Sequence, residues 1–268
     1  MAMPQTEPYK YPGRPLKGDT ELYRRKRLIF RPISPLYYLV LSSFLLVMIP
    51  YIIVFFRGAL AVGLGIPPET VGGFMVLSLL GSMANIPLYE VTTRSPIHTY
   101  RRVSFFGVTW RLPAIEMGFR KTLVTMNVGG ALIPLLFSAY LLLWSIPRVS
   151  PDPVTTYVKM AFVLTVVTFV VNRSSSLIKG LGIATPAFVP ATTVAAATLF
   201  VHWLSPLSCP TQIAYVGGTL GTLIGADLLN LRKIADLGAP VVSIGGAGTF
   251  DGVFTTGLIS VLLVLLLL

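Results

Sequence analysis

The sequence has little charge for its length. Only 12% of the 268 residues are Asp, Glu, Lys or Arg, which is about half of the roughly 25% found in soluble globular domains. Hydrophobic residues make up 54% of the chain, and the mean hydropathy is +0.77. Too few charged side chains remain to cover the surface of a water-soluble core of this size. The composition therefore excludes an ordinary soluble enzyme, a disordered chain and a coiled coil.

Residues that bind metals or act as nucleophiles are also scarce. Cys209 is the only cysteine, so neither an intrachain disulfide nor a thiol-rich metal site can form. His98 and His202 are the only histidines, which leaves few donors for a zinc site. The P-loop, HExxH and GxSxG motifs are absent. We predict no metal and no cofactor, and the sequence leaves open whether the protein is an enzyme.

Seven long apolar stretches follow one another along the chain. A helix that crosses a bilayer needs about 20 mostly apolar residues, and the stretches of this kind are 36–56, 71–91, 122–147, 154–172, 184–204, 212–231 and 251–268. The residues before them are polar, basic and rich in proline. We therefore expect an all-α, polytopic membrane protein, with a basic cytoplasmic tail over 1–35 and a transmembrane helical domain over 36–268.

The positive charges alternate between the connections. If the N-terminus is cytoplasmic, 18 of the 21 lysines and arginines lie on the inner side, and only Arg57, Arg148 and Lys159 lie outside. This asymmetry is typical of the cell membrane, and seven crossings then place the C-terminus outside. The inner connection 95–120 alternates apolar and basic residues, which predicts an interfacial helix or a short hairpin on the inner surface.

Three acidic residues are expected inside the membrane at one depth. Glu90 precedes Arg94 by four residues and Asp227 precedes Arg232 by five, so each lies about 6–8 Å inside the inner end of its span. Asp251 lies 17 residues before the last residue, about 26 Å below the outer end and again in the inner leaflet. Each also has a structural interpretation: a pair between Glu90 and Arg94, an Asp227 that reaches the interface, and an Asp251 that caps the last helix.

Small and polar residues surround these acids. Gly217, Gly221 and Gly225 are spaced by four, which predicts close contact with a neighbouring helix. Asn230 follows Asp227 by three residues and shares its side of the helix, and Asn127 starts the third span at the same inner depth. The run 238–250 is too rich in glycine for a stable helix, so we expect irregular backbone before Asp251.

Two segments carry a resemblance to a known family. The segments 221–231 (GTLIGADLLNL) and 243–252 (SIGGAGTFDG) resemble the signatures of a prokaryotic family of uncharacterised multi-pass membrane proteins, a family defined by a domain of unknown function. The resemblance extends over most of 36–268. It implies a membrane location and implies no activity.

A fainter resemblance is to intramembrane aspartyl proteases of the presenilin and signal-peptide-peptidase type. In those enzymes one Asp lies on a span that reaches the cytoplasmic side, and a second lies on the returning span after a Gly-x-Gly. Asp227 and Asp251 are similar in number, order and direction, and Gly246-Ala-Gly248 precedes Asp251. The resemblance implies that these two residues would be catalytic if the chain is a protease.

Three hypotheses for function follow. The leading one is ion- or proton-coupled transport of a small solute, with Glu90, Asn127, Asp227, Asn230 and Asp251 around a site that opens to the cytoplasm. The alternatives are an aspartyl protease that uses Asp227 and Asp251, and a non-catalytic membrane scaffold whose basic inner face is a docking surface. The expected partners are the lipid bilayer and a small solute or ion, with no nucleic acid. The sequence leaves the oligomeric state open.

Overall fold

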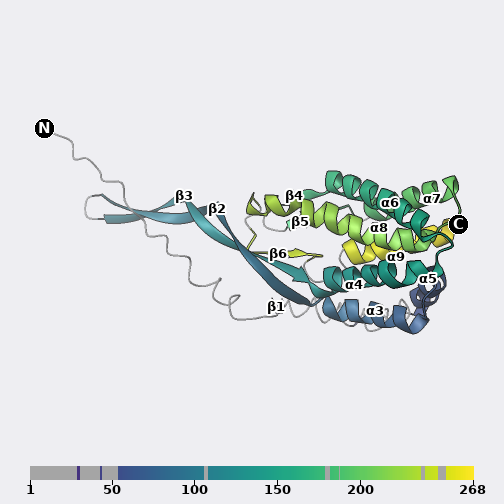
Figure 1. The fold of residues 1–268 in the computed structure, drawn as a ribbon. Helices are drawn as coiled ribbons and strands as arrows, with labels where there is room; N and C mark the ends of the chain where they lie inside the picture. The colour runs from purple at the N-terminus through teal and green to yellow at the C-terminus, as the bar shows by residue number, and fades with distance from the viewer. Residues whose placement is uncertain are drawn as a thin grey trace.

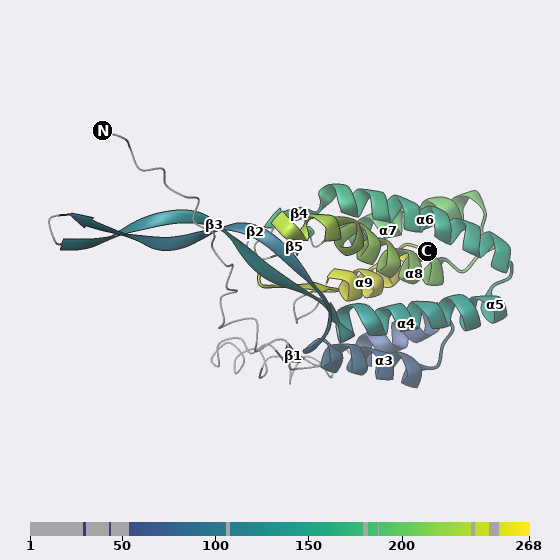
Figure 2. The ribbon, with the colours of Figure 1, turned by 60° about the vertical axis from the view of Figure 1, so that its left-hand side comes forward.

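The structure is a computed structural model, and it describes residues 29–30, 43, 54–105, 108–178, 182–186, 188–236, 239–246 and 252–268. A bundle of helices carries a long β-hairpin that projects away from one end of the bundle (Figure 1). The same arrangement is visible after rotation of the molecule (Figure 2). Most of the described regular structure is helical.

In the described residues the bundle is built from seven helical segments, some of them composite. Six of them, the helix Val54–Leu64, α3 (Pro68–Gly81), the continuous helix Val128–Val149, α6 (Pro153–Ser174), α7 (Val189–Leu204) and α9 (Gly252–Leu267), surround a seventh, the central α8 (Pro210–Thr222). Within Val128–Val149, α4 (Ile133–Tyr140) and α5 (Ile146–Val149) alternate with the π-helical segments η1 (Val128–Leu132) and η2 (Leu141–Ser145). The π-helical η3 (Leu223–Asp227) and the 3₁₀-helical η4 (Leu228–Asp236) continue α8.

The strands form two sheets. β1 (Ile29–Phe30), β2 (Ala84–Phe105), β3 (Val108–Asn127) and β6 (Val241–Ile244) make a four-stranded sheet in that order. β2 and β3 are antiparallel, and β6 runs parallel to the last residues of β3. β4 (Ser176–Ile178) and β5 (Gly182–Ala184) make a small separate hairpin. The base of the long hairpin therefore lies against the bundle, while its far part is a two-stranded ribbon.

The all-α prediction is wrong because of this hairpin. The second predicted span, 71–91, is helical only as far as Gly81, and the third, 122–147, becomes helical only at Val128. The residues between them are rich in β-branched side chains such as Val91, Thr92 and Thr93, which favour strands. Pro87 lies at the one shift of register in the β2–β3 pairing, where a strand tolerates a missing N–H.

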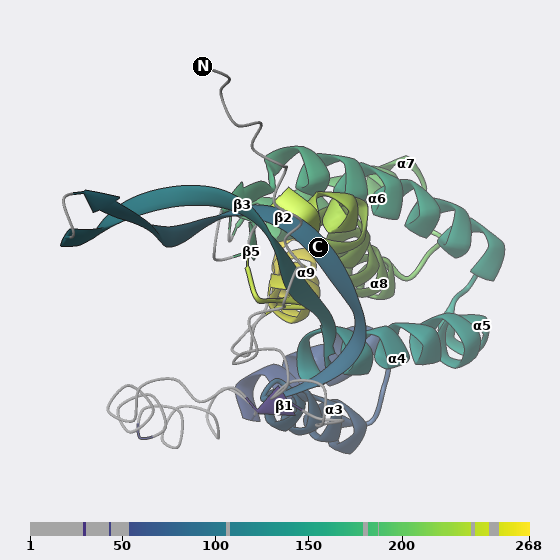
Figure 3. The ribbon, with the colours of Figure 1, turned by 90° about the vertical axis from the view of Figure 1, so that its left-hand side faces the viewer.

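The connection 95–120 is likewise part of the ribbon, in pairs that run from Ser95–Gly118 to Phe105–Val108. At about 3.3 Å per residue, the stretch beyond Arg94 is roughly 35 Å long. The ribbon extends away from the helices in all three views, including the end-on view of Figure 3. It therefore forms a projecting arm rather than an element lying across the end of the bundle.

The remaining predicted spans overlap observed helices with shifted ends. The fourth, 154–172, coincides with α6, whose N-terminus is capped by Asp152 through bonds from the Val154 and Thr155 amides at 3.0 and 3.2 Å. The fifth starts late, at Val189, because residues 182–184 form β5. The sixth corresponds to α8 and its extensions, and the seventh to α9. Most of the first, 36–56, lies outside the described residues.

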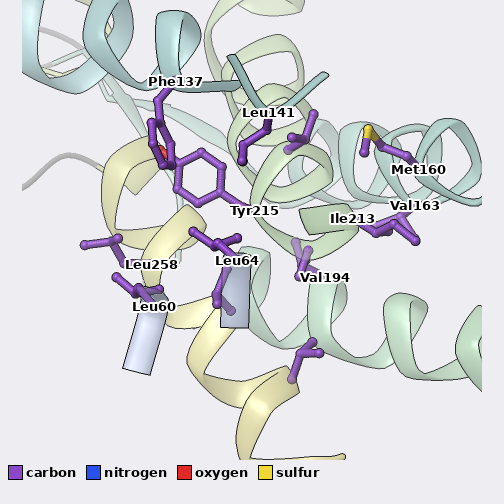
Figure 4. Close-up of a cluster of buried hydrophobic side chains, with 14 of the residues drawn as sticks. Leu60, Leu64, Phe137, Leu141, Met160, Val163, Val194, Ile213, Tyr215 and Leu258 are labelled. Atoms are coloured by element: carbon purple, nitrogen blue, oxygen red, sulfur yellow. The ribbon is translucent and has the colours of Figure 1, made fainter. Parts of the chain in front are cut away.

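Helix α8 lies at the centre of the bundle. Every residue from Thr211 to Thr219 is buried, and α8 packs against α4, α6, α7 and α9. The core around it is apolar, and Figure 4 shows Tyr215 and Ile213 of α8 among leucine, valine and phenylalanine side chains from the surrounding helices. A helix enclosed on all sides needs an apolar or small surface all round, which explains its three glycines and its alanine.

The predicted glycine contact is confirmed, and its partner is α6. A Cβ atom at Gly217 would lie 2.9 Å from Val163 Cγ1, and one at Gly221 would lie 2.8 Å from Val167 Cγ1. At Gly225 it would lie 2.6 Å from the Thr168 carbonyl oxygen. Only glycine permits this approach of the two backbones.

Two described helices are long and apolar enough to cross a membrane, Val128–Val149 and Pro153–Ser174. Three shorter apolar helices accompany them: Val54–Leu64, Val189–Leu204 and Gly252–Leu267. At about 1.5 Å per residue, the 22 residues of α6 measure roughly 33 Å, close to the thickness of a hydrocarbon core.

Candidate functional site

Asn127 lies where β3 changes into the helix Val128–Val149. Its side chain is buried, and Oδ1 accepts a hydrogen bond of 2.6 Å from the Gly130 amide, which caps η1. Nδ2 donates to the Ser82 carbonyl at 2.7 Å and to Asn85 Oδ1 at 3.3 Å. The asparagine therefore joins the end of α3, the start of β2 and the start of the long helix.

Asn85 extends this contact to β6. It is buried, and its Oδ1 also accepts a hydrogen bond of 2.7 Å from the Ser243 hydroxyl. Ser243 pairs with Thr125 in the parallel β3–β6 ladder. Neither Asn85 nor Ser243 stood out in the sequence as a site residue, because only the pairing of strands distant in the sequence brings them to Asn127.

Asp227 ends the π-helical segment η3 and reaches the turn after β6. Its Oδ2 accepts a hydrogen bond of 2.7 Å from the Gly245 amide. Gly245 and Gly246 both have positive φ angles, 76° and 88°, which a side chain would strain. A Cβ at Gly245 would lie 2.5 Å from Ala131 Cβ. The turn thus lies between Asp227 and the start of the long helix, which Asn127 caps.

Asn230 lies three residues beyond Asp227 and bonds back to the end of η3. Its Nδ2 donates to the Ala226 carbonyl at 2.8 Å and to the Gly225 carbonyl at 3.3 Å, and Lys233 Nζ donates to its Oδ1 at 3.0 Å. Asn172 of α6 also donates to the Gly225 carbonyl, at 3.0 Å. Two asparagine side chains, from α6 and η4, therefore donate to carbonyl groups at the end of η3.

Glu90 lies apart from this cluster. It is on β2, where it forms a salt bridge of 2.9 Å with Lys121 of β3, and both side chains are partly exposed. Residues 90 and 94 belong to a strand, so the helical i,i+4 spacing expected of Glu90 and Arg94 is wrong. Asp251 lies outside the described residues, so the structure does not test the pairing of Asp227 with Asp251.

The inner polar cluster therefore contains Asn127, Asp227 and Asn230 of the predicted residues. It adds Asn85, Ser243 and Asn172, and every one of these side chains contacts backbone or another member of the set. Asp227 is the only carboxylate among these six residues. In the described part of the chain no group of three or more His, Cys, Asp and Glu converges that could hold a metal ion. The cluster therefore offers one carboxylate surrounded by amide and carbonyl groups.

The opposite end of the bundle has its own polar contacts. Lys159 of α6 is buried, and its Nζ donates to the Ser205 carbonyl and to the Ser208 hydroxyl, the latter at 3.0 Å. The Arg148 guanidinium lies 3.4 Å from the centre of the Trp144 ring. Trp203 ends α7 at this end of the bundle and is 79% exposed. Amphipathic side chains of this kind suit a membrane–water interface.

Several hydroxyl groups are buried along α8 between the two ends. Tyr215, Thr219 and Thr222 are each no more than 1% exposed, and their hydroxyls have no hydrogen-bond partner among the described residues. The Ser138 hydroxyl of α4 is also buried and also has no hydrogen-bond partner among the described residues. The sequence analysis missed these residues, since isolated Ser, Thr and Tyr in an apolar helix are ordinary.

A family model described as "Protein of unknown function (DUF1614)" matches residues 79–263, more than half of the chain. The chain belongs to the DUF1614 family. The DUF1614 region includes the hairpin, the inner polar cluster, all of α8 and most of α9. No curated protein and no solved structure matches the chain.

Membership of DUF1614 confirms the part of the sequence resemblance that points to an uncharacterised family. It assigns no activity, so function has to be argued from the site. The prokaryotic origin that the resemblance implied stays a prediction.

Proposed function

We propose that this DUF1614 protein crosses the cell membrane several times and transports a small solute in a cycle coupled to a proton or cation that binds at Asp227. The hairpin, Arg173 and Arg232 would face the cytoplasm, and Trp144 and Trp203 would lie at the outer interface. Support comes from the apolar helices and from the concentration of basic residues at one end of the chain's bundle.

One observation supports Asp227 as the residue that binds the proton or cation. Asp227 stands at the inner end of the buried central helix, in a π-helical turn, with its Oδ2 held by the Gly245 amide. π-helical turns inside α-helices occur frequently at functional sites, and an acid at membrane depth is costly unless it has a function or a partner. The held oxygen fixes the direction of the carboxylate, and the amide and carbonyl groups around it are suited to a proton or a small cation.

The test is flux in reconstituted vesicles. Protein in liposomes loaded with a pH-sensitive dye should produce a proton or cation flux above protein-free vesicles, and Asp227→Asn should abolish it because the neutral amide cannot exchange a proton. Glu90→Gln is the matched control, since Glu90 is an acid on the hairpin outside the cluster. Wild-type protein without a pH- or cation-dependent flux, or an Asp227→Asn variant with normal flux, would contradict the proposal.

The hairpin favours a second candidate, a scaffold with a basic docking arm. Residues 84–127 contain six Lys or Arg and two Glu. Arg102 and Arg111 are direct register partners, and like charges directly opposite each other destabilise a ribbon. An isolated two-stranded ribbon is only marginally stable in water. An acidic protein segment bound to this arm would relieve the repulsion.

This candidate is tested with a polyglutamate peptide. The purified protein should bind the labelled peptide with an affinity that falls as salt rises, and the double change Arg102→Gln and Arg111→Gln should weaken binding. Arg173→Gln, which removes one charge from the bundle instead, should have little effect. Equal affinity for all variants, or no binding, would rule out the arm as a docking surface.

A further inference from the structure

A buried lysine lies at the end of the bundle opposite the hairpin, and the proposed transport does not use it. Among the buried residues that the structure describes, Lys159 alone is charged. It forms no salt bridge within the described part of the chain. The charge of Asp152 acts on it, but that carboxylate accepts hydrogen bonds from the Val154 and Thr155 amides instead. A buried charge without an ionic partner is costly, and such a residue in a membrane protein usually has a function.

The amine of Lys159 contacts two serines of the loop 205–209, which joins α7 to α8. Nζ donates to the Ser205 backbone carbonyl, and it lies 3.0 Å from the Ser208 hydroxyl oxygen. The first bond fixes the direction of the amine, and the second contact places it within reach of a nucleophile. A serine paired with a lysine is one variant of the serine–histidine–aspartate arrangement, in which a neutral amine takes the hydroxyl proton. Lysine suits this role when it is buried, because burial favours the neutral amine.

Ser208 lies at the edge of the bundle and not between packed helices. The loop 205–209 contains no helix or strand, and its residues Pro206 and Leu207 are exposed. A hydrogen bond of 2.8 Å from the Ser208 amide to the Pro206 carbonyl holds the serine in a tight turn. Ser208 itself is 8% exposed. A substrate therefore reaches the hydroxyl by displacing residues of a surface loop, without separating the helices of the core.

The neighbouring cysteine is a weaker candidate for the nucleophile. Burial raises the pKa of the Cys209 thiol, which keeps the thiol protonated and unreactive. The Ser208 hydroxyl, in contrast, touches the one buried amine of the described residues. The contact with Lys159 therefore selects the serine.

The start of α8 follows directly after this pair. α8 begins at Pro210, and no side chain caps its N-terminus. The first amides of a helix have no acceptor within it, and the helix dipole favours negative charge at this end. The Thr211 and Gln212 amides are thus the donors next to Ser208 for an oxyanion that forms when the serine attacks a carbonyl group.

We propose that Ser208 and Lys159 are the nucleophile and the general base of a serine hydrolase site, and that the substrate is an acyl ester of an amphipathic lipid. Trp203, Leu204 and Leu207 beside the loop are each at least 60% exposed, and side chains of this kind suit the interface in which lipid esters lie. The choice of a lipid rests on the proposed membrane location. The pair itself uses none of the residues around Asp227.

Hydrolysis proceeds in two steps. In the first, the neutral Lys159 amine takes the proton from Ser208 Oγ as this oxygen bonds to the ester carbonyl carbon. The bond from that carbon to the alcohol oxygen then breaks, and the alcohol leaves with the proton. In the second step, water attacks the acyl group on Ser208, and its proton passes through Lys159 to the serine oxygen. One water is consumed, and a carboxylic acid and an alcohol are released.

The experiment is labelling with a fluorescent fluorophosphonate, a reagent that bonds covalently to activated serines. The full-length protein is used in vesicles of phosphatidylcholine and phosphatidylglycerol. Wild type should be labelled, with the adduct located on Ser208 by mass spectrometry, and Ser208→Ala should not be labelled. Lys159→Arg should slow labelling about a hundredfold or more, because a guanidinium keeps the charge and the donor to the Ser205 carbonyl but cannot take up a proton.

Ser205→Ala is the matched control. Ser205 offers Lys159 only its backbone carbonyl, so this variant should be labelled like wild type. Asp227→Asn should also be labelled like wild type, which separates this site from the proposed transport. Fatty acid should be released from the vesicle lipid by wild type and not by Ser208→Ala.

Three results would overturn the inference: no labelling of wild type, an adduct on a residue other than Ser208, or equal labelling rates for wild type and Lys159→Arg. The last would show that the lysine only caps the end of α7. Labelling of Ser208 without release of fatty acid would overturn the choice of a lipid ester as the substrate. Because the adduct is located on the wild-type protein, the test holds even if a variant fails to fold.

Discussion

Replacing Gly225 with alanine should destabilise the bundle, because this residue sets the distance between α8 and α6. The new Cβ would lie 2.6 Å from the Thr168 carbonyl oxygen and 3.2 Å from Thr168 Cα, both backbone atoms of a 22-residue helix. A flexible side chain could rotate away from such a clash, but a helix backbone has to shift as a unit. Overpacking of this kind costs about 1–3 kcal/mol.

The helix propensity of alanine acts in the opposite direction. Alanine is favoured over glycine in a helix interior by about 1 kcal/mol, so the net loss for Gly225→Ala should be about 0–2 kcal/mol, and towards the upper end because both clashing atoms are backbone. Gly221→Ala should cost less, because its closest contact, 2.8 Å, is with the Val167 side chain. Gly73→Ala in α3 meets no atom within 4 Å and should stabilise the protein by up to about 1 kcal/mol.

The assay is unfolding in detergent micelles, followed by circular dichroism as temperature or denaturant rises. The expected order of stability is Gly73→Ala, wild type, Gly221→Ala and then Gly225→Ala. If Gly225→Ala proves as stable as Gly73→Ala, the close contact between α8 and α6 is absent in solution, and the position described for Asp227 is contradicted as well.

Three further predictions concern other parts of the chain. Asn127→Ala leaves the Gly130 amide and the Ser82 carbonyl without their partner, so the unfolding free energy should fall by about 2–4 kcal/mol, and a loss below 1 kcal/mol would refute the capping role. Hydrogen bonds from the Thr155 hydroxyl and amide lower the pKa of Asp152 in the folded protein. The stability that these bonds contribute is present above the pKa of Asp152 in the unfolded chain, and it is lost as pH falls through the lower pKa of Asp152 in the folded protein. Thermal unfolding of wild type should therefore show a loss below about pH 4 that Asp152→Asn lacks, and parallel pH profiles would contradict this. Replacing residues 95–118 by an Asn-Gly turn, which joins the register partners Arg94 and Phe119, should leave the unfolding temperature of the bundle unchanged, since this part of the ribbon projects away from the helices; a marked drop would show that it packs on the bundle.

The sequence predicted those elements whose residue pattern lies within one continuous segment. The apolar run 154–172, with Lys159 as its only charged residue before Arg173, indicated α6. The four-residue spacing of Gly217, Gly221 and Gly225 indicated a close helix contact before its partner was known. Both signals are periodic and lie within one element, so a single sequence contains them in full.

A short hairpin was one of the two alternatives predicted for 95–120, but its extension to 84–127 was missed because the apolar flanks were interpreted as helices. Residues 84–91 and 122–127 are apolar enough to extend a membrane span, yet they pair with each other across about 30 to 40 residues of chain, and β6 pairs with Leu123–Met126 of β3. That pairing joins residues that are far apart in the chain, so it produces no regular residue pattern from which it could be predicted. Because of this pairing, Glu90 lies on an exposed strand and not on the expected helix. The pairing also brings Asn85 and Ser243 into contact with Asn127, and no sequence motif indicates this contact.

The most direct test of the account is the sidedness of the two ends of the bundle. In a Cys209→Ser background, a single cysteine is placed either at Ser104 on the hairpin or at Leu207 in the loop between α7 and α8, both of which are exposed. Intact cells are treated with a membrane-impermeant maleimide before and after permeabilisation. We predict that Leu207→Cys reacts in intact cells and that Ser104→Cys reacts only after permeabilisation. Labelling of both cysteines from the same side would show that the bundle does not cross the membrane and would contradict the account.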